Sequence, residues 1–299
     1  MDRFQEMKVL LAVTEAESFA GGAKLLGISP PSVTRAVAAL EARLGTLLLA
    51  RSTRSLRLTE AGQRYVEDCR RILLELEEAE ELAAGGSVRP RGRLTVTAPV
   101  MFGELFLIPR IAQYLDTYPD VEINALLVDR VVNMMEEGID VAVRIGHLPD
   151  SSLKALRVGQ VRRVLCASPE YLARQPLPQH PADLLRHTII AATGISPRVE
   201  WKFGAVDDPT MVRLRPRLTV TSNDAAIEAA CAGLGICRLL SFQIADHLAA
   251  GRLKIVLSEY EEAPWPVHLV HRESKFGSSK VRNFIDLLAN HLRADPHLN

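Results

Sequence analysis

The sequence predicts an all-α N-terminal part, one long connecting helix and an α/β part built of two lobes. Three observations predict this order. Apolar residues recur at helical spacing up to about residue 45, a heptad pattern follows as far as residue 83, and strands alternate with helices from residue 93 onward. The chain has 299 residues, of which 47% are apolar, so it is long enough for two or three domains with sizeable cores.

The composition excludes several classes of protein. The chain carries no net charge at neutral pH, so any surface for nucleic acid must be a local patch. Its four cysteines form no C-x-x-C pair, and no histidine completes a zinc pattern, so we predict reduced thiols, no metal site and no cofactor. No run of about 18 apolar residues occurs, and the start MDRFQEMKVLLAV is unlike a secretory signal, which predicts a cytoplasmic protein without membrane contact.

The first 45 residues carry the start and stop signals of short helices. Ser18 is placed to cap a helix that ends at Leu26, and Gly27 suits a tight turn. Ser29 is placed to cap the next helix. Pro30 falls at its first position, where a missing N–H costs no hydrogen bond. The two adjacent prolines therefore fix the entry of the helix and do not break it.

The helix that begins at Pro30 has two unlike faces. One is an apolar stripe expected to face a core, made of Val33, Val37, Leu40 and Leu44. Arg35 points the opposite way among small residues, which permit close approach to another surface, while Ser, Thr and Arg bind phosphates and base edges. Ala23, Gly27 and Val33 have the offsets of a helix-turn-helix, with a plain helical hairpin as the alternative. The predicted DNA contacts are Ser29, Pro30, Pro31, Ser32, Thr34 and Arg35.

A basic stretch, RSTRSLRLTEAG at residues 51–62, follows this helix. Arginines alternate there with polar and apolar residues in a hairpin-like pattern. Residues 30–64 hold six arginines and two glutamates, a net charge of +4. We interpret the hairpin as a wing that binds the DNA backbone through Arg51, Thr53 and Arg54.

A long helix is predicted after the wing, capped by Thr59 and starting at Glu60. Residues 65–88 hold seven acidic residues and two arginines, so this helix should avoid DNA. It should pair with a second subunit, with packing against its own chain as the alternative. Residues 85–92, GGSVRPRG, indicate a hinge. The apolar positions of its heptad seam are Tyr65, Cys69, Ile72, Leu76, Ala79 and Ala83.

Beyond residue 92 the alternation of strands and helices favours parallel α/β sheets. Ligands in such sheets bind at the carboxyl ends of the strands, in the crevice between lobes. We divide the chain into residues 1–58, 59–88 and 89–299, with lobe I at about 92–160 and 266–299 and lobe II at about 161–265. The predicted strands are 93–98, 121–128, 139–145, 161–168, 217–222, 235–240 and 266–272; the predicted helices include 131–138, 169–174, 223–233 and 277–294.

The segment SFAGGAKLLGISPPSVTRAVAALEARLGTLLLARSTRSLRLTEAG resembles the winged helix-turn-helix of LysR-type transcriptional regulators. TAPVMFGELFLIPRIAQYL and RRVLCASPEYLAR resemble the effector-binding domain of that family, and in particular its branch with an AP-x-x-FG segment. The resemblance implies an effector domain folded like periplasmic solute-binding proteins. It also implies dimers through the linker helix, tetramers through the effector domains, promoter DNA and RNA polymerase as partners, and a small-molecule effector.

Two predicted helix starts and one strand end offer candidates for the effector site. Helix N-termini favour anions, but the first start has few hydroxyl donors and Asp224 lies beside the second, which favours a small, partly apolar effector. Ordinary packing or capping is the alternative for each residue. The candidate effector-binding residues are Thr97, Ala98, Pro99, Val100, Met101, Arg144, Gly146, His147, Thr193, Trp201, Phe203, Ser222 and Asn223.

No motif of a common enzyme class occurs, neither G-x-S-x-G nor H-E-x-x-H nor a P-loop, and no pair of acidic residues forms a convincing catalytic dyad. We therefore predict no catalytic residues. The predicted function is a sequence-specific DNA-binding transcriptional regulator, switched by an effector bound between two α/β lobes. Two alternatives remain: an enzyme or solute-binding module with a helical oligomerisation domain, and an architectural DNA-binding protein without a ligand.

Overall fold

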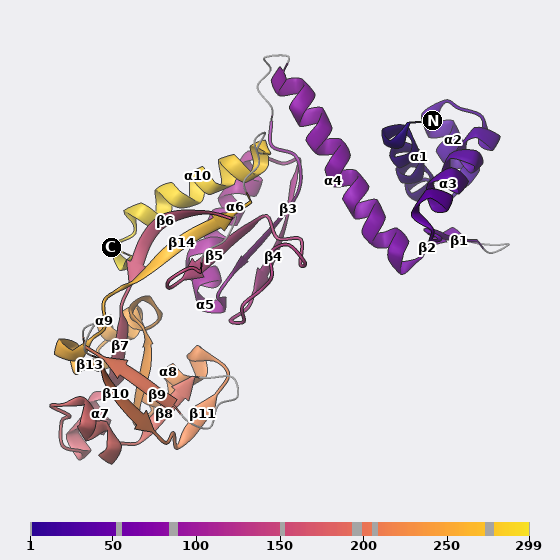
Figure 1. The fold of residues 1–299 in the computed structure, drawn as a ribbon. Helices are drawn as coiled ribbons and strands as arrows, with labels where there is room; N and C mark the ends of the chain where they lie inside the picture. The colour runs from indigo at the N-terminus through magenta and orange to yellow at the C-terminus, as the bar shows by residue number, and fades with distance from the viewer. Residues whose placement is uncertain are drawn as a thin grey trace. The chain divides into compact units, whose positions relative to one another are not determined.

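The computed structural model describes residues 2–51, 56–83, 89–149, 153–192, 199–204, 209–272 and 278–298 (Figure 1). Contacts divide the chain into two compact units, residues 1–93 with 278–280 and residues 94–277 with 281–299. No described helix is long and apolar enough to cross a membrane. Residues 85–88 of the expected hinge lie outside the described residues.

The N-terminal unit is helical apart from one small hairpin. Its elements are α1 (Arg3–Glu15), α2 (Phe19–Leu26), α3 (Pro30–Leu44), β1 (Leu49–Arg51), β2 (Leu56–Leu58) and α4 (Glu60–Ala83). Ser18 caps α2 by accepting from the amide of Gly21, and Gly27 ends it with a φ of 63°. The α3 stripe packs as predicted at Val33, Val37 and Leu40, which are fully buried against α1.

Two details of α3 correct the prediction. Leu44 is 37% exposed, because the helix ends there and Gly45 turns the chain away with a φ of 68°. Ser29 stands at the N-cap without bonding a backbone amide, since its hydroxyl pairs with that of Ser32 at 2.8 Å. Entry into α3 therefore depends on Pro30 and Pro31, whose rings fix the backbone of the first turn.

Helix α4 begins as predicted, with the Thr59 hydroxyl accepting from the Gly62 amide at 2.9 Å. The predicted heptad seam is divided between two environments. Tyr65 and Cys69 pack against the core of the helical domain, so here the alternative of packing against the same chain holds. Ile72 and Leu76 are half-buried farther along the helix.

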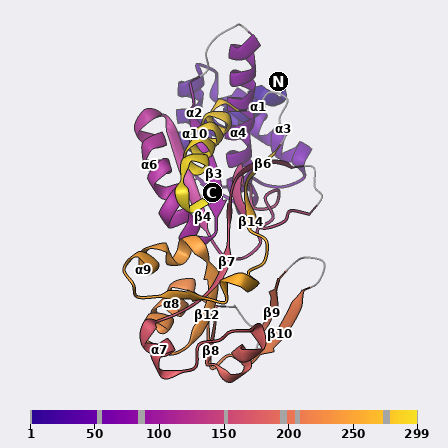
Figure 2. The ribbon, with the colours of Figure 1, turned by 90° about the vertical axis from the view of Figure 1, so that its left-hand side faces the viewer.

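Lobe I is a five-stranded sheet in the order β4-β3-β5-β14-β6. Helices α6 and α10 cover one of its faces (Figure 2). Between these two helices the rings of Tyr114 and Phe284 meet edge to face. Its elements are β3 (Gly92–Ala98), α5 (Val100–Phe102), the π-helical turn η1 (Gly103–Leu107), α6 (Ile108–Thr117), β4 (Val121–Leu127), β5 (Val141–Ile145), β6 (Lys154–Val161), β14 (Trp265–His271), α10 (Ser279–Ala294) and the 3-10 turn η5 (Pro296–Leu298).

Lobe II is a second five-stranded sheet, ordered β11-β8-β12-β7-β13. Helix α8 packs on one face and the β9–β10 hairpin on the other (Figure 2). Its elements are β7 (Arg163–Ala167), α7 (Pro169–Arg174), η2 (Pro181–Arg186), β8 (Ile189–Ala192), β9 (Val199–Phe203), β10 (Thr210–Leu214), β11 (Leu218–Val220), α8 (Asn223–Cys231), β12 (Ile236–Leu240), η3 (Ser241–Ile244), α9 (Ala245–Ala249), β13 (Lys254–Val256) and η4 (Ser258–Tyr260).

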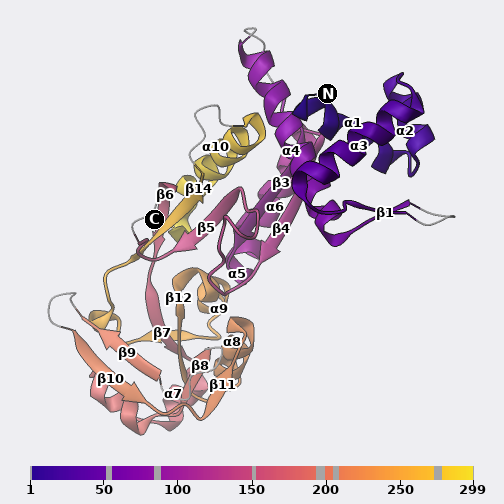
Figure 3. The same cartoon turned by 45° about the vertical axis from the view of Figure 1, so that its right-hand side comes forward.

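The chain crosses between the lobes twice, where β6 runs into β7 and where the segment after β13 runs into β14 (Figure 3). These crossings make both sheets mixed, not parallel as predicted. Strand β14 returns antiparallel to both β5 and β6, and β7 lies antiparallel to β12 and β13. The pairs β3–β5, β8–β11 and β8–β12 are parallel.

The predicted helix at 131–138 is wrong, since residues 131–133 are irregular and residues 134–138 form turns. The Asn133 carboxamide accepts from the amide of Met135 at 3.1 Å, and Arg130 binds Glu137 at 2.6 Å across the segment. Local bonds of this kind offer the backbone an alternative to the helical ladder. Gly138 then adopts a φ of 64° and leads into β5. Val132 and Met134 of this segment pack with Ile139, Ala142 and Val270 in a small buried cluster of lobe I.

Candidate DNA-binding face and ligand cavities

The face of α3 opposite the core is exposed and nearly free of other charges. Pro31, Thr34 and Arg35 are all exposed on it, and Ser32 is half-buried. The Nε of Arg35 donates to the carbonyl of Pro31 at 3.3 Å, which directs the side chain back along the helix. Arg35 has no ion-pair partner among the described residues, so its terminal nitrogens are available to an outside acceptor.

Buried carboxylates fix the base of the wing relative to α3. Glu41, on the core side of α3, accepts the backbone amides of Leu48 and Leu49 at 2.8 and 3.0 Å. Arg43 pairs with the buried Glu6 of α1 at 2.8 Å. These bonds connect the recognition helix to both neighbouring elements, so its exposed face has a defined position beside the hairpin.

The hairpin itself is antiparallel, with Ala50 opposite Arg57. Arg51 ends β1, while Thr53 and Arg54 lie outside the described residues, so their predicted contacts stay predictions. Arg57 is exposed on β2 and was counted in the basic stretch without being chosen as a contact. Its alternation with Leu56 and Leu58 was the signal that could have identified it.

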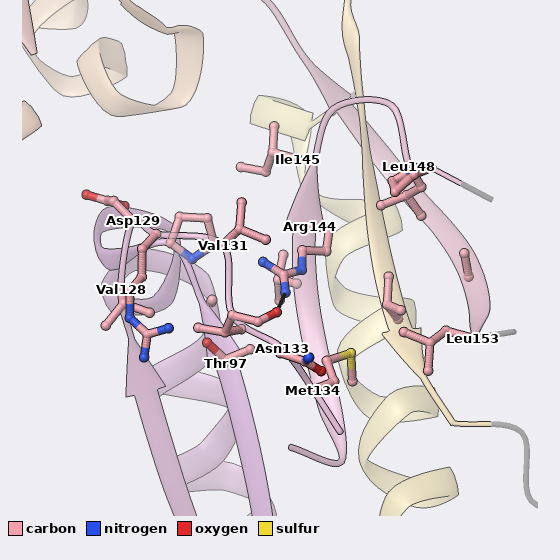
Figure 4. Close-up of a pocket in the computed structure, with 18 of the residues that line it drawn as sticks. Thr97, Val128, Asp129, Val131, Asn133, Met134, Arg144, Ile145, Leu148 and Leu153 are labelled. Carbon is pink, nitrogen blue, oxygen red and sulfur yellow. Dashed lines mark hydrogen bonds between the residues drawn. The ribbon is translucent and has the colours of Figure 1, made fainter. Parts of the chain in front are cut away.

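The larger of the two described cavities, about 900 Å³, is lined entirely by residues of lobe I (Figure 4). We call it the lobe I cavity. Its walls are mostly apolar, with Val128, Met134 and Leu153 among them, and one half-buried guanidinium, that of Arg144, lies in it. Arg144 donates to the carbonyl of Val132 at 2.7 Å, and burial lowers its pKa.

The polar groups of the lobe I cavity largely satisfy one another. The Asp129 carboxylate accepts the Val100 amide at 3.1 Å, so the start of the first helix already has an anion of its own. The Thr97 hydroxyl donates to the carbonyl of Leu126 at 2.7 Å. Arg130, which also lines the cavity, is paired with Glu137. A ligand here would therefore meet an apolar surface with Arg144 as its principal donor.

A second cavity, of about 470 Å³, lies between the lobes, and we call it the interlobe cavity. It adjoins the first at the end of β5, because Ile145 and His147 line both. Lys202 and Gly204 line it from lobe II, and Trp265 from lobe I. Glu262, on the second crossing, completes the charged part of its wall.

The structure brings together some of the candidate effector residues and separates others. Thr97, Ala98, Pro99, Arg144 and His147 line the lobe I cavity, and Gly146 and His147 line the interlobe cavity. The remaining described candidates line neither. They are Val100 and Met101, Trp201 and Phe203, which are 5% and 2% exposed in the core of lobe II, and Ser222 and Asn223, which start α8. Thr193 lies outside the described residues.

Sequence reasoning missed the residues that give the cavities their polarity. Asn133 was assigned to a helix that does not form, and Lys202 lies between the two aromatic residues that were chosen. Glu262 and Trp265 follow no motif, and only the return of the chain to lobe I places them beside β5. Fold topology, not local pattern, creates this site.

Comparison with known proteins decides the family. Residues 4–63 match the bacterial regulatory helix-turn-helix proteins of the lysR family, and residues 87–293 match the LysR substrate binding domain. The chain belongs to the LysR family. It is 33% identical to the uncharacterized HTH-type transcriptional regulator YhjC of Escherichia coli K12, over 97% of each chain.

Two further relatives support the same assignment over nearly the whole chain. The HTH-type transcriptional repressor PA14_22550 of Pseudomonas aeruginosa is 32% identical, over 100% of this chain and 95% of the relative. The solved structure of CrgA, a LysR-type transcriptional regulator from Neisseria meningitidis, is 30% identical with a TM-score of 0.61, over 98% of this chain and 99% of CrgA.

The family confirms the predicted fold and function. This LysR-type chain has a helix-turn-helix domain for DNA and a domain for a small-molecule effector. Its relatives are named as transcriptional regulators, which confirms the prediction that it is not an enzyme. The alternatives of an enzyme with a helical oligomerisation domain and of an architectural protein without a ligand are therefore set aside.

Proposed function

We propose that this LysR-type regulator reads its operator with the exposed face of α3 and holds the flanking phosphates with the β1–β2 hairpin. The observation that carries the proposal is Arg35, exposed among small residues and without an ion-pair partner among the described residues. Arg35 and Ser32 would contact base edges, while Arg51, Arg54 and Arg57 would bind phosphates. Because its proposed target is promoter DNA, we propose that the regulator acts in the cytoplasm.

Binding of duplex DNA to Arg35→Ala tests this assignment. Fluorescence anisotropy with the DNA upstream of the chain's own gene, at two salt concentrations, gives specific affinity and salt dependence together. Losing one base contact should cost about 1–3 kcal/mol and relax sequence preference. Arg57→Ala should weaken specific and random DNA about equally and make the salt dependence shallower.

Lys8→Ala serves as the matched control, because Lys8 is an exposed cation on α1. An Arg35→Ala variant that binds specific DNA as tightly as Lys8→Ala would contradict the proposed readout. If neither variant nor the unchanged chain binds this DNA at low salt, selection from genomic fragments would supply the operator for the same comparison.

We further propose that two subunits pair through α4 and that effector domains pair into a tetramer that meets RNA polymerase at a bent promoter. LysR-type regulators are oligomeric, and Ile72 and Leu76 of α4 are only half-buried within one chain. A charge at Leu76 would be costly in a helix pair. Sedimentation of Leu76→Glu should therefore show smaller assemblies than Arg70→Glu, a change on the polar side of the seam.

The effector, we propose, binds at the end of β5, where the two cavities meet at Ile145 and His147. Their combined lining is concave and mostly apolar with a few convergent polar groups, as ligand sites usually are. An effector there contacts both lobes and the second crossing. It can favour one lobe arrangement over another only through unequal affinity for the two, which is how it would change the spacing of DNA contacts.

Blocking the meeting point tests this location. A thermal-shift panel of acidic, basic and uncharged aromatic compounds of about ten heavy atoms would identify binders of the full chain. Ile145→Trp should abolish the shifts, while Leu177→Trp, at an exposed position of lobe II, should retain them. Binders that stabilise both variants equally would place the site elsewhere.

A further inference from the structure

The interlobe cavity has a buried cation directly behind its wall. Arg238, on β12, is only 4% exposed, yet its Nη2 donates to the Lys202 carbonyl at 2.7 Å and to the Glu262 carboxylate at 2.8 Å. Both acceptors belong to residues that line the cavity. The guanidinium also lies over the ring of Phe203, 5.2 Å from its centroid, which fixes its plane.

Two nitrogens of this guanidinium have no acceptor. Its Nε and Nη1 are buried and make no hydrogen bond to any described residue. Buried donors of charged groups nearly always have a hydrogen-bond partner, because a buried donor without one loses its hydrogen bonds to water and gains none in return. Arg238 itself does not line the cavity, but two unused donors directly behind the cavity wall leave a place for an acceptor that the described residues do not supply.

The charges around Arg238 do not balance. Glu262 is shared with a second arginine, Arg163, at 3.0 Å, and Arg163 in turn lies over the ring of Trp265 at 4.4 Å. One carboxylate thus serves two guanidiniums, and the Lys202 side chain adds a third cation without an ion-pair partner among the described residues. Burial, reinforced by the charge of Arg163, lowers the pKa of Arg238 to about 10, so it stays protonated at neutral pH.

The neighbouring lobe I cavity lacks this excess. Its Arg130 is paired with Glu137, and Asp129 balances Arg144 in sign. An anion would therefore be drawn to the interlobe cavity, where Trp265 and Ile145 provide an apolar wall for the rest of the molecule. The interlobe cavity thus favours an anionic group of a ligand, whereas the lobe I cavity favours an apolar group.

We propose that the effector is a small carboxylate with an apolar body, whose carboxylate is bound by Arg238 and Lys202 in competition with Glu262. This deepens the proposed effector site at the end of β5 and rests on it. Because Glu262 lies on the second crossing between the lobes, a ligand that takes over Arg238 loosens the hold of lobe II on that crossing. Glu262 acts as the chain's own competitor for the ligand's place.

Calorimetric titration of the full chain with benzoate tests the proposal, with benzamide as a probe of nearly the same shape without charge. Benzoate should bind at least about tenfold more tightly than benzamide, since only the carboxylate gains charge-assisted bonds. Arg238→Gln should weaken benzoate about tenfold or more and leave benzamide unchanged. Lys202→Gln, at a half-buried position, gives the same test if Arg238→Gln does not fold.

The carboxylates of the crossing provide a matched pair. Glu262→Gln removes the competitor and should tighten benzoate binding several-fold. Glu261→Gln removes the adjacent carboxylate, which pairs with Arg162 and does not line the cavity, and should leave the affinity unchanged. A purely structural role for Glu262 predicts weaker binding or none in Glu262→Gln, which would overturn the competition.

Other results would also overturn the inference. They are equal affinity for benzoate and benzamide, unchanged benzoate binding in both Arg238→Gln and Lys202→Gln, or binding of inorganic phosphate in place of benzoate. The proposed site would survive such results if uncharged panel compounds still lost their binding in Ile145→Trp. If Ile145→Trp removed no binder, the site itself would fail, so the two failures are distinguishable.

Discussion

Replacing Glu41 by alanine should loosen the wing without touching any residue that meets DNA. Glu41 is 8% exposed, and its carboxylate accepts the amides of Leu48 and Leu49, residues that are 1% and 3% exposed. Alanine leaves both amides without an acceptor. Each unsatisfied buried donor costs about 1–3 kcal/mol, so the two together cost about 2–6 kcal/mol. That is a large share of the stability of an ordinary domain.

Hydrogen exchange of the full chain measures this locally. The amides of Leu48 and Leu49 should lose protection in Glu41→Ala, and the affinity for DNA should fall because the hairpin no longer has a fixed position beside α3. Glu41→Gln keeps one acceptor oxygen and should lose only about 1 kcal/mol. Glu60→Ala removes an exposed carboxylate that pairs with Arg64 and is the control.

The result that refutes this reasoning is specific. If Glu41→Ala folds and exchanges the two leucine amides no faster than Glu60→Ala, the carboxylate does not hold the start of the hairpin. A loss of DNA affinity with protection unchanged would equally separate Glu41 from the wing, because the proposed effect passes through these two bonds.

Three further predictions concern packing, pH and thiols. Gly62→Ala should lower the free energy of unfolding of the N-terminal unit by about 1–3 kcal/mol, and with it the urea midpoint, because a Cβ would lie 2.0 Å from the Leu48 carbonyl oxygen; an unchanged midpoint would show that α4 can move aside. Burial lowers the pKa of His187 below its ordinary 6.5, so the unfolded chain takes up this proton more readily; stability should fall as pH drops from about 7 to 5, and less so in His187→Gln. Burial raises the pKa of Cys69 to about 11, so a thiol reagent on the folded chain should spare Cys69 and reach the half-buried Cys231 first; rapid labelling of Cys69 would contradict its packing.

Local patterns predicted the N-terminal unit well because its elements are set by nearby residues. The Ser18 cap, the glycine turn at Gly27 and the stripe of α3 all act within one or two helical turns. The effector domain was predicted less completely. Strands β6, β8, β9, β10 and β13 were not assigned, and the sheets were expected to be parallel. Strand direction depends on where β14 returns, over a hundred residues after β5, and no local pattern encodes that.

The positions of the candidate ligand residues, too, were predicted correctly where nearby residues determine them and incorrectly where the fold does. Thr97, Ala98 and Pro99 were found because they lie at or just after the carboxyl end of a predicted strand. Trp201 and Phe203 were chosen as part of a stretch of lobe II expected to be irregular and to close the pocket, but the structure places them on a strand, among the core residues of lobe II. Lys202, between them on β9, lines the interlobe cavity, because successive residues of a strand point to opposite faces. If a strand had been assigned at 199–203, its alternation would have predicted that Lys202 points to the face opposite Trp201 and Phe203.

Glu41 and Arg238 are both buried charged residues, but they differ in how completely the fold satisfies their hydrogen bonds. Glu41 is buried with acceptors matched to two backbone amides, so its desolvation is compensated within the fold. Arg238 is buried with Nε and Nη1 unmatched by any described residue and with a second arginine close by. A charge that served packing alone would be better replaced by an apolar side chain of similar size. The position of Arg238 directly behind a cavity wall instead supports the proposal that an outside anion completes these bonds.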